Sequence, residues 1–89
     1  MLSVMELDNL SVLELMERSP SEVDWEMYNS PYYAHDVLVN VRRSVLNCQD
    51  ILYELGDWKH IPVLEEWWRH LRANIAKLRW RIQGIELGE

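Results

Sequence analysis

Two long apolar ladders constrain the fold of this chain more than any other feature of its sequence. In each ladder the residues are spaced alternately by four and three positions, and no polar residue interrupts them. The first ladder comprises Ala34, Leu38, Val41, Val45, Cys48, Leu52 and Leu55, and the second comprises Leu64, Trp68, Leu71, Ile75, Leu78, Ile82 and Ile85. This spacing places an apolar stripe on one face of an α-helix and is typical of helices that pack at a shallow angle.

Proline, serine and glycine mark where these two helices begin and end. The dipeptide Ser30-Pro31 is a helix start, Gly56 is a helix stop, and Pro62 belongs in the first turn of the next helix. We therefore predict long helices over residues 31–55 and 62–85. Because the connection between them is short, they must run antiparallel, and the ladders pair about the turn with Leu55 near Leu64.

The first 29 residues hold the signals of shorter helices. Ser11 and Ser19 are each followed three positions later by a glutamate, which is the pattern of a capping box. We expect one short helix that begins at Val4 or Ser11 and ends at Glu17, and a second over residues 20–28. The predicted fold is all-α: a single domain, 1–89, with a long antiparallel hairpin and one or two short N-terminal helices packed on it as a small helical bundle.

A second apolar row on the first long helix needs cover. Val39, Leu46 and Tyr53 are spaced by seven residues, so they share a face that the ladder does not use. We expect the short N-terminal helices to cover most of this row. The alternative is that part of it binds a second copy or another protein. Trp67 and Trp80 lie outside the second ladder, and one of them is expected to be an exposed or interface indole.

Charge is distributed unevenly along the chain, whose formal net charge is -6. Residues 1–40 hold eight acids and one arginine, whereas residues 69–81 hold five basic residues and no acid. Three of these basic residues and two arginines of the first long helix form a predicted basic belt: Arg42, Arg43, Lys77, Arg79 and Arg81. We expect the acidic front of the same chain to neutralise this belt. If it does not, the alternative function is nucleic-acid binding or regulation, although the negative net charge weighs against it.

The sequence lacks the constellations that catalysis or cofactor binding requires. Cys48 lies on an apolar ladder, where its thiol should be unreactive, and three histidines are scattered along the chain. Glu66 and His70 share a helix face, but even with His60 they supply too few ligands for a bundle metal centre. The three glycines are not clustered, which excludes a glycine-rich phosphate loop. We therefore expect no enzyme activity, no cofactor and no metal.

No apolar run is long enough to cross a membrane, and the N-terminus lacks the pattern of a signal peptide. With its single cysteine, the chain is expected to be cytoplasmic. The chain resembles small acidic inhibitors encoded by phages and mobile elements, such as anti-CRISPR and other anti-defence proteins, in size and charge alone.

The predicted function is a non-catalytic protein-binding module that acts alone or as a homodimer on a protein with a basic surface. Its binding surface is expected to combine acidic and aromatic side chains. The candidate binding residues are Glu14, Glu17, Glu22, Asp24, Trp25, Tyr28, Tyr32, Tyr33, Trp67 and Trp80.

Overall fold

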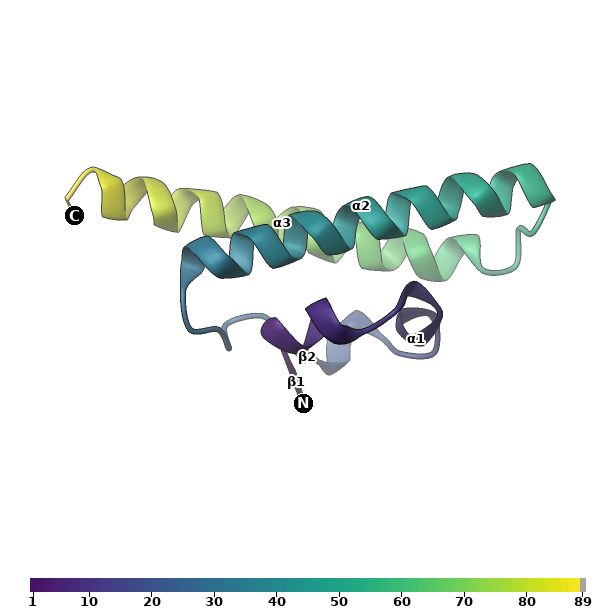
Figure 1. Ribbon diagram of the computed structural model, residues 1–89, viewed down its shortest axis with the longest axis horizontal. Helices are drawn as coiled ribbons and strands as arrows, with labels where there is room; N and C mark the ends of the chain where they lie inside the picture. Colours follow the sequence, from purple (N-terminus) through teal and green to yellow (C-terminus); the bar gives the residue numbers. More distant parts are fainter. Residues whose placement is uncertain (89) are drawn as a thin grey trace.

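The computed structural model describes residues 1–88, and its largest part is a hairpin of two long helices. Helix α2 spans Pro31–Leu55 and helix α3 spans Ile61–Glu86, and they run antiparallel along the long axis of the molecule (Figure 1). The molecule measures 49 × 24 × 17 Å, so the hairpin sets its elongated shape. The predicted all-α hairpin is confirmed, with α2 at its predicted bounds.

Local interactions explain both ends of α2. At its start, the side-chain oxygen of Ser30 accepts a hydrogen bond from the backbone N–H of Tyr33, 3.5 Å away. At its end, Gly56 adopts a left-handed conformation with φ of 73°, and its N–H reaches the carbonyl oxygen of Leu52. A residue with a Cβ atom would be strained at this φ, so glycine suits the point where the chain turns back.

The predicted ladders are buried only along the middle of the hairpin. The buried ladder residues are Ala34, Leu38, Val41, Val45, Leu64, Leu71, Ile75 and Leu78. Toward the ends of the helices Cys48, Leu52 and Ile82 are half-buried, and Leu55 and Ile85 are exposed. The prediction of a continuous buried seam is therefore wrong at its ends, because α2 and α3 project beyond the segment that packs on them.

Residues 1–30, here called the strap, form that packing segment. The strap contains three short helical elements and two two-residue strands: β1 (Leu2–Ser3), η1 (Met5–Asn9), α1 (Val12–Met16), η2 (Pro20–Glu22) and β2 (Val23–Asp24). Both predicted capping boxes are present, at the starts of α1 and η2. The strands pair in parallel, with Leu2 opposite Val23, and thereby join the two ends of the strap.

The predicted helix over residues 20–28 is not formed. After the three residues of η2 the backbone becomes extended, because Val23 and Asp24 pair with β1. The carbonyl oxygen of Met27 also accepts a hydrogen bond from the N–H of Val4, 3.1 Å away. These contacts with residues far away in the sequence replace the hydrogen bonds of a helix, and β-branched Val23 accepts the extended conformation readily.

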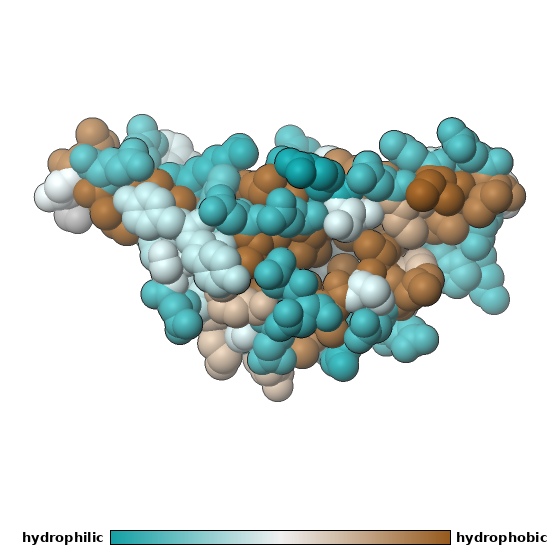
Figure 2. Space-filling model, viewed as in Figure 1, coloured by the Kyte–Doolittle hydropathy of each residue, from teal (hydrophilic) through white to brown (hydrophobic). Residues whose placement is uncertain are grey.

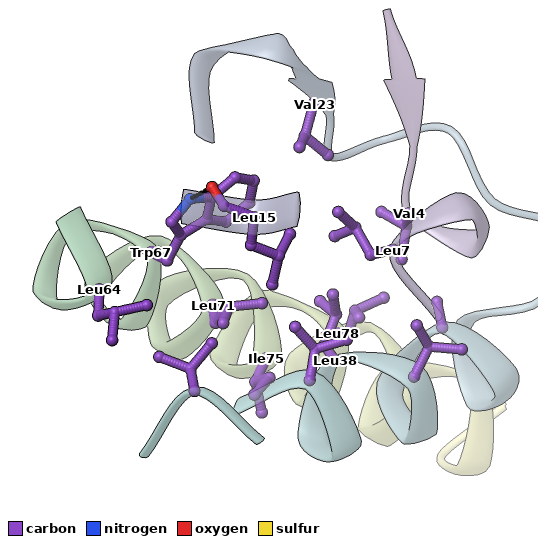
Figure 3. Close-up of a cluster of buried hydrophobic side chains, with 14 residues drawn as sticks. Val4, Leu7, Leu15, Val23, Leu38, Leu64, Trp67, Leu71, Ile75 and Leu78 are labelled. Atoms are coloured by element: carbon purple, nitrogen blue, oxygen red, sulfur yellow. Dashed lines mark hydrogen bonds between the residues drawn. The ribbon is translucent and has the colours of Figure 1, made fainter. Parts of the chain in front are cut away.

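The core lies where the strap meets the middle of the hairpin. Val4, Leu7, Leu15 and Val23 of the strap are buried against the central ladder residues of both long helices (Figure 3). Burial of a large aliphatic side chain contributes about 1.5–3 kcal/mol, so these residues account for the attachment of a segment with little regular structure. The expectation that the N-terminal elements pack on the hairpin is confirmed.

The strap covers one side of the hairpin. On α2 its residues lie beside Asn40, Val41 and Ser44. On α3 they contact Trp67 and Arg81 through hydrogen bonds. Both ends of the hairpin extend past the strap in Figure 1. The opposite side of the hairpin is here called the open face.

Candidate protein-binding surfaces

Three of the four predicted acidic residues of the strap, Glu14, Glu17 and Glu22, are exposed, and two of them also stabilise its turns. A carboxylate oxygen of Glu14 accepts a hydrogen bond from the N–H of Ser11 at 3.2 Å. Glu22 accepts one from the N–H of Ser19 at 2.6 Å. These carboxylates satisfy backbone donors that the short helices leave free. Part of the acidity of the strap therefore has a structural role.

Ion pairs neutralise little of this acidity. The guanidinium of Arg18 lies 3.7 Å from Glu22, and that of Arg81 lies 3.1 Å from Glu26, with all four side chains partly exposed. Within residues 1–88, neither Glu14 nor Glu17 has a basic group within 4.0 Å. Asp24, another candidate, is half-buried and accepts a hydrogen bond from the N–H of Glu26 at 3.1 Å. The strap thus presents a mainly negative surface to solvent.

Two of the predicted aromatic binding residues pack within the fold instead. Trp25 is half-buried, with its indole N–H donating to the carbonyl oxygen of Pro20 at 3.2 Å. Its ring meets the edge of Trp67 at 6.4 Å and stacks on His70 at 6.3 Å, measured between ring centroids. Tyr28 is also half-buried, and the guanidinium of Arg81 lies 5.4 Å from its ring centroid. Both residues attach the strap to α3.

Trp67 is no part of any surface, and its selection as a binding residue is wrong. Its exposed fraction is 0%, and its indole N–H donates to the carbonyl oxygen of Leu15 at 2.8 Å (Figure 3). The ladder spacing assigns Trp68 to the core, but Trp68 is only half-buried. The reason is that the strap packs beside the ladder and encloses the neighbouring position on α3.

The other three aromatic candidates are exposed but do not adjoin the acids of the strap as one surface. Trp80 is 75% exposed on α3 and lies beside Ala76 and Gln83. Tyr32 and Tyr33 are exposed in the first turn of α2. Tyr32 borders a groove with His35 and Arg79, on the hairpin itself. The acidic and aromatic candidates are therefore divided between different parts of the molecule.

The expected neutralisation of the basic belt occurs only at Arg81. Of the belt residues within the described part of the chain, this arginine alone lies within 4.0 Å of a carboxylate, that of Glu26. Arg79 donates instead to the imidazole of His35 at 3.2 Å. Arg42 is half-buried, and Arg43 and Lys77 are exposed. The acidic strap lies on one side of the hairpin, which explains why most of the belt stays unpaired.

Further apolar residues are exposed in the structure, and one of them, Leu55, belongs to a predicted ladder. Ile51, Tyr53, Leu55 and Trp58, here called the hairpin tip, surround the turn between α2 and α3, and the rings of Tyr53 and Trp58 meet edge to face at 5.0 Å. Leu13 of α1 is 70% exposed as well. In Figure 2 hydrophobic residues are visible at the turn end of the hairpin, whereas the outer edge of the strap carries both hydrophilic and hydrophobic residues.

Within residues 1–88 no group of three or more His, Cys, Asp or Glu side chains is placed to hold a metal ion. Nδ1 of His70 lies 3.0 Å from the backbone oxygen of Glu66, so this pair forms a local contact. At the turn, Nδ1 of His60 lies 3.1 Å from a carboxylate oxygen of Asp57. That hydrogen bond lowers the pKa of Asp57 below its usual value of 3.8. Cys48 is a half-buried free thiol.

Comparison with protein-family models, curated proteins and solved structures finds no match for this chain. Among residues 1–88 no helix combines the length and apolar character that a membrane crossing requires.

Proposed function

We propose that this protein is a non-catalytic protein-binding module whose acidic strap recognises a basic surface on another protein. The observation that carries this proposal is the exposed Leu13 on α1, followed directly by Glu14 and four positions later by Glu17. An apolar side chain beside carboxylates suits an interface in which an apolar contact is surrounded by complementary charges.

The rigidity of α1 supports this proposal. The capping box at Ser11 fixes its first turn, and Leu15 is buried and bonded through its carbonyl oxygen to Trp67. Leu13 therefore extends from a helix that is fixed before this residue by its cap and after it by the buried Leu15. A preorganised contact residue loses less conformational entropy on binding than one in a flexible loop.

The hairpin tip offers a second apolar contact for the same partner. Leu55 is 75% exposed and Trp58 is 64% exposed, and α1 is the helical element of the strap nearest to the turn end of the hairpin (Figure 1). Exposed apolar patches on small proteins commonly mark interaction sites. We include the tip as the edge of the proposed interface, with the acidic strap as its main part.

A module of this kind can act as an inhibitor by occupying a basic surface that otherwise holds nucleic acid. Its own carboxylates would then compete with phosphates for the same arginines and lysines of the target. This mode of action fits a small phage- or mobile-element-type protein that blocks a defence complex. The proposal predicts that the partner loses nucleic-acid binding when the module is added.

The proposal is tested by capturing the partner from an extract of the source organism, identifying it, and measuring rebinding of the purified pair by calorimetry. Leu13→Ala should weaken binding by about tenfold, as truncation of a central contact residue does. Glu17→Lys should also lower the affinity, because the reversed charge repels the partner. This loss relative to the wild type should grow as the ionic strength falls, since salt then screens the repulsion less.

Two matched variants serve as controls. Leu87→Ala removes an equally exposed leucine at the far end of α3, and Glu86→Lys reverses an exposed acid at the same end, away from both the strap and the hairpin tip. Both should leave the affinity unchanged. Equal losses in the controls and in the strap variants would contradict the proposal.

A further inference from the structure

The open face of the hairpin carries two stripes that the strap does not use. On α2 the stripe residues alternate between spacings of four and three, and on α3 they are spaced by three, four, seven and seven positions. Each set therefore lies along one side of its helix. The α2 stripe is His35, Val39, Arg42, Leu46, Gln49 and Tyr53, and the α3 stripe is Glu65, Trp68, Arg72, Arg79 and Glu86.

Two grooves run between these stripes. One is lined by Leu46, Gln49, Glu65, Trp68 and Arg69. The other lies toward the opposite end of the hairpin, where Asp36 and Glu86 line it together with His35 and Arg79, so the positive charge of this face is concentrated between the grooves. No residue of the strap lines either groove, so the strap leaves this side of the hairpin uncovered.

The floor of the open face is partly apolar. Val39 and Trp68 are half-buried at the edge of the core, and Leu46 remains exposed. From the sequence, the N-terminal elements are expected to cover the row that contains Val39 and Leu46. They pack on the other side of α2 instead, beside Asn40 and Ser44.

Arginine side chains border this apolar floor. Neither residues 37–49 nor residues 67–85 contain an acid, so the middle of the hairpin carries positive charge alone. Arg42, Arg72 and Arg79 belong to the stripes, and Arg69 lines a groove. Within residues 1–88 none of these four has a carboxylate within 4.0 Å.

We propose that the open face binds an acidic amphipathic helix of another protein. The apolar side of such a helix would lie in the groove along Leu46 and Trp68. Its carboxylates would reach the arginines on either side, since a helix placed in a groove presents residues at three- and four-residue spacing. This surface is separate from the acidic strap and carries the opposite charge, so it selects a partner segment of different chemistry.

The arrangement of Trp68 argues for a helix over a nucleic acid. The guanidinium of Arg72 lies over the Trp68 ring, 5.4 Å from its centroid, and therefore covers a ring face on which a base would stack. The apolar floor gives no advantage to a phosphate backbone. The net charge of -6 also opposes the long-range attraction of a polyanion.

Charge likewise argues against two copies that meet through their open faces. Arginines of one copy would face arginines of the other across the apolar floor, and like charges in a desolvated contact repel. The partner must therefore supply the negative charge.

The test uses a fluorescein-labelled synthetic peptide of about 18 residues, long enough for about five helical turns. Leucines at helical three-four spacing form one side of the peptide, and glutamates flank them. A scrambled peptide of the same composition, a single-stranded oligothymidine and a DNA duplex are measured beside it by fluorescence anisotropy. We expect the amphipathic peptide to bind most tightly.

Arg72→Glu should lower the affinity for that peptide by about tenfold, because it places a like charge at the edge of the groove. Arg43→Glu makes the same change on an exposed residue outside both stripes and should leave the affinity within about twofold. Circular dichroism confirms that each variant is folded.

Any of three results overturns the proposal. The scrambled peptide binds as tightly as the amphipathic one, Arg43→Glu weakens binding as much as Arg72→Glu does, or an oligonucleotide binds more tightly than the peptide. The strap variants Leu13→Ala and Glu17→Lys should bind the amphipathic peptide with unchanged affinity. This result separates the present proposal from the function proposed for the strap.

Discussion

The indole N–H of Trp67 donates a hydrogen bond to the carbonyl oxygen of Leu15, 2.8 Å away and 52 positions earlier in the chain. The same N–H lies 3.3 Å from the carbonyl oxygen of Arg18. This contact joins the strap to α3 inside the core, where Trp25 also packs against the Trp67 ring. It fixes which side of the hairpin the strap covers, and it thereby leaves the opposite side open.

The importance of this contact can be measured with Trp67→Phe. Phenylalanine keeps an aromatic ring but cannot donate a hydrogen bond, so the carbonyl oxygen of Leu15 keeps only its backbone donor, the N–H of Arg18 at 3.0 Å. The smaller ring also leaves space in the core. We expect a loss of about 1–3 kcal/mol in the free energy of unfolding, measured by chemical denaturation. Trp80→Phe, at an exposed position of the same helix, should change it by less than about 0.5 kcal/mol. Equal effects would contradict the structural role of Trp67.

The central part of the seam is tested with Leu71→Asp and Val45→Asp. Each residue is fully buried between the long helices, so each variant places an unpaired carboxylate in the core at a cost of several kcal/mol. We expect both variants to be unfolded at room temperature by circular dichroism. Ala73→Asp, on an exposed part of α3, should fold normally. A cooperative thermal transition in Leu71→Asp at the wild-type temperature would show that the helix pairing is wrong.

The capping box of α1 predicts a smaller effect. The Ser11 side chain accepts a hydrogen bond from the N–H of Glu14 at 3.2 Å. Ser11→Ala removes this acceptor and should lower the free energy of unfolding by about 1 kcal/mol. Ser44→Ala, in an exposed interior position of α2, should have almost no effect or a slightly stabilising one, because alanine favours helix. If Ser11→Ala left the free energy of unfolding unchanged, α1 would not depend on its cap.

The Asp57–His60 pair predicts a pH effect at the turn. The hydrogen bond from His60, followed by smaller contributions that include its charge, lowers the pKa of Asp57 below 3.8 in the folded chain. A carboxyl group whose pKa falls on folding adds stability above its unfolded pKa, and this is lost as the pH falls through the lower folded value. His60→Ala should therefore raise the pKa of Asp57 toward 3.8, as followed by carboxyl-carbon NMR. The control variant His35→Ala should leave the pKa of Asp57 unchanged. If His60→Ala also left the pKa of Asp57 unchanged, the pairing of Asp57 with His60 would be contradicted.

The long helices could be predicted from sequence because their signals are local and repeated. The four-three ladders, the Ser30-Pro31 start and the Gly56 stop each act within a few residues, and they placed α2 at its observed bounds. Both capping boxes of the strap were predicted for the same reason. Leu55 and Ile85 follow the ladder pattern without being buried, because periodicity does not reveal where the covering segment stops.

The strap and the candidate surfaces depend on contacts between distant residues, which spacing alone does not specify. Val23 has a strand partner twenty-one positions earlier, at Leu2, so residues 20–28 could not be assigned from local propensity. The ladder spacing predicts that Trp68 is buried, whereas Trp67 is the buried residue. This error also comes from a contact between distant residues, since the position of Leu15 decides which indole is enclosed. One signal was present but not used: the spacing of Trp68, Arg72 and Arg79 indicates a second side of α3.

The proposed use of the acidic strap is tested most directly by NMR, with the ¹⁵N-labelled protein titrated with its captured and purified partner. The account predicts that the largest amide shift changes occur around Leu13 and the neighbouring acids of α1, with smaller changes at the hairpin tip. Changes confined to α2 and α3 around Arg72, with the amides of α1 unperturbed, would contradict it.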